Sequence, residues 1–315
     1  MSREVLRIGT RGSALALVQA EMTGCALAVA HPNLELERVV VKTIGDKRPD
    51  LRFSEFGAGG EGIVDKGIFT KELEEALAEG TVDIAVHSLK DVPTELAEGY
   101  SLPCVLPRAS IEDVLISHSQ GGIDGLPENA RIGTSSVRRI RQLLFLRPDL
   151  EPVEIRGNVP TRIRKLNQRE DDLDAILLAR AGLERLGIFG DEAGLDYSIL
   201  DPVSFLPAAA QGAVGIEIHS RSGNRVTDLL TAIHCQDTGD RVAAERAFLA
   251  ALGAGCETPV GLFSTLHEDG GQITLHARVF SDGSTSSDPP VEGQSTGLRT
   301  APEALASDLL TLLFP

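Results

Sequence analysis

Apolar and polar positions in the first two-thirds of the chain repeat one pattern: a short apolar run, a tight polar turn and an amphipathic segment. Strands are predicted at residues 6–9, 82–87, 131–133, 153–155 and 175–179. Helices are predicted after most of these turns. One begins near Ala14, and another places Val137, Ile140 and Leu144 on one face. This alternation predicts an α/β fold with mainly parallel sheets and helices on both faces.

The pattern changes after about residue 230. A helix is predicted at 242–252, and the alternation over 273–279 predicts an antiparallel-type strand with one exposed side. Residues 281–297 are rich in Ser, Gly and Pro and are predicted to form a long solvated turn. A last helix is expected to start with a capping box at 300–303 and to bury Leu305, Leu309, Leu312 and Leu313. These elements indicate a small α+β domain.

We therefore expect three domains. The first combines residues 1–107 and 212–229, the second covers 108–211, and the third covers 230–315. Residues 46–67 contain several glycines and little periodicity, which is typical either of a mobile lid or of a plain surface insertion.

Composition narrows the classes of partner. The net charge is −16, yet residues 131–169 carry nine Arg and one Lys against three acids, a local balance of +7. A basic segment in an acidic chain favours a small anionic ligand over a nucleic acid, because the acidic remainder would repel a long polyanion. The chain has no Trp and two Tyr, few for a surface that stacks bases.

The N-terminal residues and the cysteines indicate the expected location of the protein and the expected absence of a metal. The first residues lead directly into a predicted strand without the features of a signal peptide, and no apolar run approaches a membrane span, so we expect a cytoplasmic protein with no membrane partner. The four cysteines show neither CxxC spacing nor nearby histidine partners. A zinc site and a disulfide framework are therefore not expected. No metal is predicted.

Polar side chains follow the predicted strands. In open α/β sheets ligands lie beyond the carboxyl ends of the strands, so these turns should line one crevice or two facing ones. Guanidinium groups there would bind carboxylates in paired hydrogen bonds, although single arginines are usually solvated. The Lys90–Asp91 pair could stabilise a cation or move a proton, or could be a surface ion pair. His87, inside an apolar strand, is interpreted as a hydrogen-bonded core residue.

Cys256 lies in a glycine-containing turn after a predicted helix, which would expose its thiol. The negative end of the helix dipole disfavours a thiolate there. The spacing therefore leaves two interpretations open, a reactive cysteine or an ordinary one.

Several segments of the sequence, taken in order, resemble porphobilinogen deaminases. They span nearly the whole chain and comprise residues 7–13 with 15–17 and Gln19, 66–74, 85–93, 133–139, 156–159 with 161–162, 208–215 and 245–259. Together these segments are specific for that family, although no single segment is.

The resemblance implies a tetrapyrrole biosynthesis transferase. Such an enzyme condenses four porphobilinogen molecules head to tail, releases ammonia each time and hydrolyses the product to hydroxymethylbilane. It is primed on one dipyrromethane cofactor, bound through a thioether to the cysteine that matches Cys256. The implied fold has two lobes like those of periplasmic binding proteins and a third domain that carries the cofactor. We expect a monomer.

The resemblance also assigns roles to residues. Asp91 matches the catalytic acid. Cofactor-binding positions are Cys256, Lys90, Asp91, Ser88, Thr134, Ser136, Arg138, Arg139, Asn158 and Gln211. Substrate-binding positions are Arg11, Ser13, Gln19, Phe69, Arg156, Arg162 and Arg185.

Three departures from the family pattern stand out. Ala254 replaces the first glycine of Gly-Gly-Cys, which matters if that position needs a positive φ. Val64-Asp65 replaces two glycines before Lys66, after a longer loop, and Pro160 stiffens the turn after Asn158. Two competing hypotheses remain: a bilobal anion receptor without catalysis, which would not need Cys256, and a basic nucleic-acid module, which the total charge disfavours.

Overall fold

The computed structural model describes residues 5–41, 70–190, 194–254, 258–268, 270–281 and 288–315. Two compact units are formed. Unit 1 contains residues up to 108 and 213–239, and unit 2 contains 109–212 and 240–315. The predicted three-domain division stays a prediction.

Unit 1 is built on a five-stranded mixed sheet of order β2-β1-β3-β10-β4. Its strands are β1 (Val5–Thr10), β2 (Glu35–Val40), β3 (Ile84–Ser88), β4 (Tyr100–Val105) and β10 (Val214–His219). β1 pairs in parallel with β2 and β3, whereas β10 runs antiparallel to β3 and β4. The α/β class is confirmed, but half of these pairings are antiparallel, so the sheet is mixed rather than mainly parallel.

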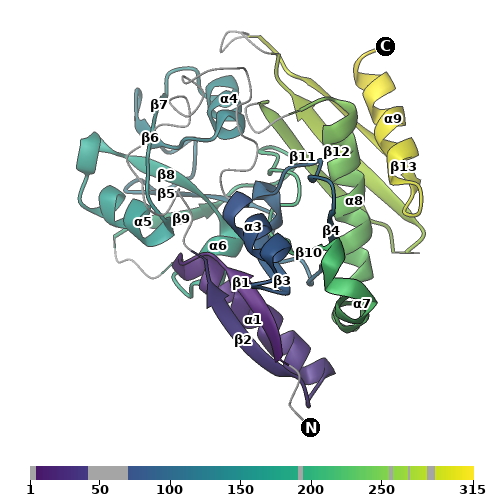
Figure 1. Ribbon diagram of the computed structural model, residues 1–315. Coiled ribbons are helices and arrows are strands. Elements are labelled where there is room, and N and C mark those ends of the chain that lie inside the picture. The colour runs from purple at the N-terminus through teal and green to yellow at the C-terminus, as the bar shows by residue number, and fades with distance from the viewer. Residues whose placement is uncertain (1–4, 42–69, 191–193, 255–257, 269, 282–287) are drawn as a thin grey trace, which may run out of the picture. The chain divides into compact units, whose positions relative to one another are not determined.

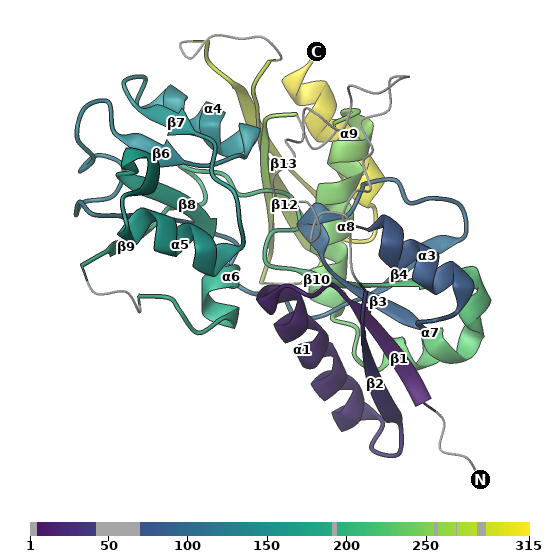
Figure 2. The same ribbon diagram turned by 60° about the vertical axis from the view of Figure 1, so that its left-hand side comes forward.

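Helices cover both faces of this sheet. The helices are α1 (Ala14–Ala30), α3 (Lys71–Glu79) and α7 (Gly223–Thr231). α1 lies alongside β1 and β2 (Figure 2) and shares a core with α7 in which Leu27, Val86 and Ile216 are buried. α3 packs on the other face through Leu73 and Leu77. Helices therefore cover both faces of the central strands, as expected for buried strands rich in apolar residues.

Unit 2 has a second mixed five-stranded sheet, of order β7-β6-β8-β5-β9. Its strands are β5 (Asp113–Ser117), β6 (Arg131–Gly133), β7 (Glu151–Val153), β8 (Ala175–Ala179) and β9 (Asp196–Ile199). β6 is parallel to β7 and β8, and β5 is antiparallel to β8 and β9. α4 (Val137–Leu146) packs on one face through Leu143, and α5 (Val159–Asn167) and α6 (Arg180–Arg185) pack on the other.

The buried face of α4 differs from the predicted one. The apolar residues Val137, Ile140 and Leu144 are only half-buried, whereas Arg138, Arg139, Gln142 and Leu143 form the buried face. The apolar stripe does not mark the buried side, because Leu143 packs in an apolar cluster while Arg138 and Arg139 on the same side are paired with buried Asp113. This reversal places two arginines of the sequence prediction inside unit 2.

The rest of unit 2 is an antiparallel sheet of β11 (Val260–Leu266), β12 (Gln272–Val279) and β13 (Val291–Leu298). α8 (Gln236–Ala251), from Asp240 onward, and α9 (Pro302–Leu313) belong to the same unit and pack on this sheet (Figure 1). The alternating positions 273, 275, 277 and 279 all face this core, as predicted.

Three local predictions in this region were wrong. Residues 291–297 of the predicted solvated turn belong to β13, since strand pairing with β12 overrides their Gly and Ser content. Leu312 is 60% exposed rather than part of the buried stripe. The N-cap of α9 is Ala301 and has no side-chain cap bond, so the capping box does not form. Within the described part of the chain, every helix is too short or too polar to cross a membrane.

Candidate functional site

The carboxyl ends of β1 and β3 open into a pocket of unit 1 with a volume of about 120 Å³. Five of its lining residues are predicted site residues, namely Arg11, Ser13, Gln19, Ser88 and Asp91. The sheet topology explains this, because β1 and β3 are parallel neighbours whose following turns meet at one edge. The structure therefore brings together two segments that are far apart in the sequence.

Hydrogen bonds fix the wall of this pocket. Ser13 is the N-cap of α1 and its hydroxyl accepts a hydrogen bond from the backbone N–H of Ala16 at 3.3 Å. The Gln19 amide, 2% exposed, donates to the Ser88 hydroxyl at 2.8 Å, and a 3.1 Å contact links the same hydroxyl to the Gln19 amide oxygen. These contacts tie α1 to the end of β3.

Asp91 lies on a single 3₁₀ turn, Leu89–Asp91, directly after β3. Buried Leu89 anchors the turn, and Lys90 and Asp91 are exposed on it. Asp91 lines the pocket. The sequence places an accessible carboxylate at this point because Val92 and Pro93 leave helical geometry after one turn.

His87 and Glu217 form a buried hydrogen-bonded contact beside the same pocket. His87 Nε2 lies 3.0 Å from Glu217 Oε2, and the two side chains are 5% and 0% exposed. The antiparallel pairing of β10 with β3 brings them together. His87 is thus a hydrogen-bonded core residue, as predicted, and it also lines the pocket. Sequence reasoning missed Glu217, whose only signal is an acid within an apolar strand.

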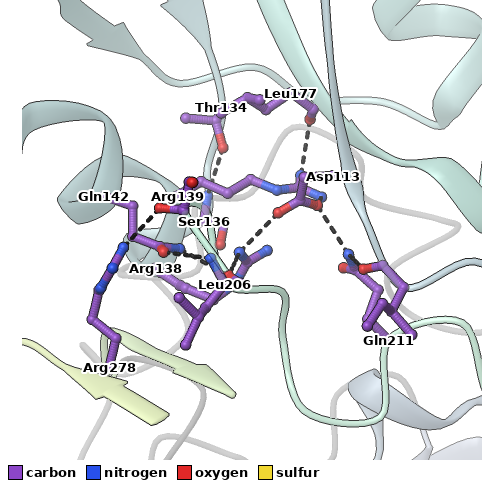
Figure 3. Close-up of polar contacts among 12 residues, drawn as sticks. Asp113, Thr134, Ser136, Arg138, Arg139, Gln142, Leu177, Leu206, Gln211 and Arg278 are labelled. Atoms are coloured by element: carbon purple, nitrogen blue, oxygen red, sulfur yellow. Dashed lines mark hydrogen bonds and ion pairs between the residues drawn. The ribbon is translucent and has the colours of Figure 1, made fainter. Parts of the chain in front are cut away.

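A second set of predicted site residues lies in unit 2 around Asp113 (Figure 3). Arg138 and Arg139 are each 6% exposed, and Asp113 is fully buried. Arg138 Nη1 is 2.8 Å from Asp113 Oδ2, and Arg139 Nη2 is 2.7 Å from Asp113 Oδ1. We call Asp113, Arg138, Arg139 and Gln211 the Asp113 cluster.

Gln211 completes this cluster. Its Nε2 donates to Asp113 Oδ1 at 3.0 Å and to the carbonyl of Ile111 at 2.7 Å. The preceding Ala210 has a φ of 56°, an uncommon left-handed conformation for a non-glycine residue. The Ala210 N–H donates to the buried Glu245 carboxylate at 2.6 Å, which holds this turn in place.

The electrostatics of the cluster are unbalanced. Although burial alone would raise it, the pKa of Asp113 is lowered because the Arg138 and Arg139 guanidiniums stabilise its charge. Burial lowers the pKa of Arg138 despite Asp113. Two guanidiniums share one carboxylate, and Arg139 Nε is buried with no hydrogen-bond partner among the described residues. The cluster can therefore accept a further anion.

Thr134 and Ser136 precede α4. Thr134 is buried, and its hydroxyl accepts a hydrogen bond from the Ser136 N–H at 3.2 Å. Ser136 is the N-cap residue of α4. Both lie on the turn that leads to Arg138 and Arg139, as the strand–turn–helix pattern predicted.

The turn after β7 presents the remaining predicted groups. Asn158 is the N-cap of α5, and its side chain accepts from the Thr161 N–H at 3.0 Å. Arg156 pairs with Glu154 at 2.6 Å, and Arg162 Nε donates to the Gly157 carbonyl at 2.8 Å. Pro160 lies in the first turn of α5, where its missing N–H needs no partner, so this departure fits the helix.

Arg185 lies at the end of α6, away from that turn in sequence. Its Nη2 donates to the Gly212 carbonyl at 2.7 Å, and burial lowers its pKa. It therefore contacts the backbone next to Gln211. The convergence of the unit 1 pocket and the unit 2 groups on one crevice stays a prediction.

Two predicted residues, Phe69 and Cys256, lie outside the described residues, as do the 46–67 loop and the Val64–Gly67 departure. The departure at Ala254 is described. Gly253 has a φ of 67° and ends α8, whereas Ala254 does not have a positive φ, is 8% exposed and packs in the apolar core. A glycine at position 254 is therefore not required for this backbone.

In the described part of the chain, no group of three or more His, Cys, Asp or Glu side chains is arranged to hold a metal ion. The donors that do gather are guanidiniums, hydroxyls, amides and isolated carboxylates. This set of donors suits an organic anion.

Comparison with known proteins gives one result over most of the chain. The family model described as porphobilinogen deaminase, dipyromethane cofactor binding domain, matches residues 6–227, and the model for the C-terminal domain matches residues 240–310. The porphobilinogen deaminase of Syntrophomonas wolfei is 44% identical over 303 residues, 94% of each chain. That of Rubrobacter xylanophilus is 47% identical, covering 81% of this chain and 78% of its own.

Similarity to solved structures is weaker. The methionine-binding protein MetQ aligns with a TM-score of 0.45 and 11% identity, over 80% of this chain and 96% of its own. The periplasmic aliphatic sulphonate binding protein SsuA from Escherichia coli aligns with a TM-score of 0.41 and 12% identity, over 80% of this chain and 71% of its own. On the sequence matches, which cover nearly all of its length, the chain belongs to the porphobilinogen deaminase family.

Proposed function

We propose that this protein is a hydroxymethylbilane synthase. It joins four porphobilinogen molecules head to tail, releases one ammonia for each and uses water to free the linear tetrapyrrole. Besides family membership, one observation carries the proposal: Asp91 lines a pocket with Arg11, Ser13 and Ser88. Arg11, Ser13 and Ser88 can bind the two acidic side chains of the substrate. The Asp91 carboxylate can stabilise the positive charge that develops on the pyrrole.

The described residues also fit a dipyrromethane cofactor. Its acetate and propionate groups need cationic donors, and the Asp113 cluster has a surplus positive charge with Arg139 Nε still unpartnered among the described residues. Arg138, Arg139 and Gln211 would hold these carboxylates, with Thr134, Ser136, Ser88 and Lys90 as further donors. When bound, the dipyrromethane supplies the pyrrole position to which the first substrate is joined. We propose Cys256 as its attachment point.

Asp91 has the catalytic role in this proposal. Its exposed carboxylate can accept a hydrogen bond from a pyrrole N–H and stabilise the positive charge that develops as ammonia leaves. It can also take up and return the proton that moves during carbon–carbon bond formation. Arg11, Ser13 and Gln19 then orient the substrate, together with Phe69, Arg156, Arg162 and Arg185.

Intact-protein mass spectrometry tests the proposal. The purified protein should exceed its sequence mass by two porphobilinogen units less two ammonias, and Cys256→Ser should remove that excess. A matched Cys25→Ser control, at an exposed cysteine of unit 1, should keep it. An active protein with no excess mass would overturn the cofactor assignment. An inactive protein without excess mass that binds porphobilinogen reversibly would favour the anion-receptor hypothesis instead.

Two finer points belong to the same proposal. We propose that the enzyme is cytoplasmic and works as a monomer. Light scattering coupled to size-exclusion chromatography should give a mass near 33.5 kDa plus the adduct. A dimer mass at working concentration would contradict this.

A further inference from the structure

Asp113 is the common partner of both buried arginines, and the sequence patterns did not single it out. It opens β5 and has no exposed surface. Each carboxylate oxygen receives one guanidinium, with Oδ2 facing Arg138 at 2.8 Å and Oδ1 facing Arg139 at 2.7 Å. The Gln211 amide makes a third contact, to Oδ1 (Figure 3). One side chain thus sets the positions of three predicted cofactor-binding residues.

A second anchor restrains each guanidinium. Arg138 Nη1 donates to the Leu206 carbonyl at 2.6 Å, and Arg139 Nη1 donates to the Leu177 carbonyl at 2.8 Å. The Gln142 side chain makes two hydrogen bonds to the Leu206 backbone. Its Oε1 accepts from the Leu206 N–H, and its Nε2 donates to the Leu206 carbonyl. The two arginines are therefore held in fixed positions without any ligand.

The charge count separates this arrangement from an ordinary structural ion pair. A buried pair that only fills space balances one cation with one anion, because an uncompensated buried charge is costly. Here two guanidiniums face one carboxylate, and Arg139 Nε has no partner among the described residues although it is buried. A second carboxylate would restore the balance.

We propose that Asp113 is a positioning residue that holds Arg138 and Arg139 as a fixed, net-cationic pair for a carboxylate of the dipyrromethane. This inference rests on the proposed function. Asp113 does not touch the reacting atoms. It acts through the arginines, by setting their spacing and by leaving one positive charge unmatched.

Asp113→Asn tests the proposal, because it keeps the size of the side chain and removes its charge. The asparagine N–H₂ would face a guanidinium, so the arginine pair should lose its fixed geometry. We expect the fraction of purified protein that carries the two-pyrrole adduct to fall at least tenfold by intact mass. Full loading of the variant would overturn the proposal. An adduct missing from the unsubstituted protein would instead count against the proposed function.

Leu143→Ala is the matched control for lost stability. Leu143 is fully buried, lies on α4 beside the arginines and has no polar role. This variant should be destabilised and still carry the adduct. Equal loss of adduct in the two variants at equal melting temperature would show that the cluster is only structural, and the proposal would fail.

Asp113→Ala provides a measurement that stands even if the asparagine variant folds poorly. The missing carboxylate leaves a space between the guanidiniums that formate can occupy. Formate should raise the melting temperature and increase adduct formation from added porphobilinogen several-fold, whereas neutral formamide should do neither. Identical effects of formate and formamide, or no effect of either, would overturn the proposal.

Discussion

At the scale of single residues, Asp91 and Asp113 are carboxylates in opposite settings. Asp91 is exposed on a one-turn helix and lines a pocket, so it can meet a substrate. Asp113 is fully buried, and it contacts the two guanidiniums and the Gln211 amide rather than solvent. Substitution of the first should therefore affect turnover, and substitution of the second should affect folding and loading.

Asp91→Asn should retain the covalent adduct and lose at least about a hundredfold in turnover, the usual contribution of a positioned acid–base group. The amide keeps a similar shape but neither carries the charge nor exchanges the proton. Product formation and intact mass, measured on one preparation, check this. Unchanged turnover would remove Asp91 from its assigned role.

Asp113→Asn should lower the free energy of unfolding at neutral pH by about 3–5 kcal/mol, as expected when one partner of a buried ion pair is lost. Folding lowers the pKa of Asp113. Its charge therefore stabilises the folded protein when the pH is above 3.8, the usual pKa of the carboxyl group. That contribution is lost as the pH falls through the lower folded-state pKa.

Denaturant titrations at a series of pH values check this prediction. The difference in unfolding free energy between the parent protein and Asp113→Asn should stay constant above about pH 5. It should narrow in stronger acid, because the carboxyl group of the unfolded chain has a pKa near 3.8. The deficit of Leu143→Ala should not depend on pH. A gap for Asp113→Asn that is equally flat would exclude a role for the charge.

At the scale of elements, sequence patterns predicted the strand–turn–helix units because each has a local signal. β6 and β8 lie where the apolar runs indicated, and the turn residues follow them. The patterns failed where a distant partner decides the outcome. The polar face of α4 is buried because of Asp113, and β13 forms because β12 lies beside it. Asp113 itself gave one weak signal, an acid at the start of an apolar strand.

The end of α8 gives a prediction at the same scale. Gly253→Ala should destabilise the protein by about 1 kcal/mol, because its φ of 67° disfavours a side chain. Ala254→Gly, which restores the family's residue, should also cost about 1 kcal/mol through the lost buried methyl group and the freer unfolded chain.

Both variants should keep the covalent adduct in full, since Ala254 faces the core and not a ligand-binding position. Urea unfolding and intact mass measure the two effects separately. Higher adduct content in Ala254→Gly would mean that the methyl group does restrict the turn that we propose carries the cofactor.

At the scale of the whole molecule, the charge is divided rather than uniform. The chain carries −16 in total, yet its basic segment at 131–169 contributes the arginines of the Asp113 cluster. Porphobilinogen carries two carboxylates and one ammonium group. Binding of its carboxylates to local positive charge should weaken with salt, because at 0.5 M electrostatic interactions extend over only a few ångströms.

The KM for porphobilinogen should therefore rise about two- to fivefold between 20 mM and 500 mM NaCl, with a smaller change in kcat, because exposed charges are screened over this range. Initial-rate measurements at fixed pH check this, and an uncharged osmolyte at matched osmolality is the control. A KM that is independent of salt would mean that buried donors alone hold the substrate.

The Asp113 cluster also bears on how the protein is made. Its members are separated by 26 residues between Asp113 and Arg139 and by 98 between Asp113 and Gln211. On the ribosome, the charged face of α4 emerges long before residues 206–211 that help to satisfy it. Until that segment has been synthesised, Arg138 and Gln142 lack their contacts with Leu206, and Asp113 lacks its contact with Gln211. The buried polar face of α4 is then only partly satisfied, which disfavours its docking. We therefore expect this part of the nascent chain to pack only after about two-thirds of the sequence has been translated.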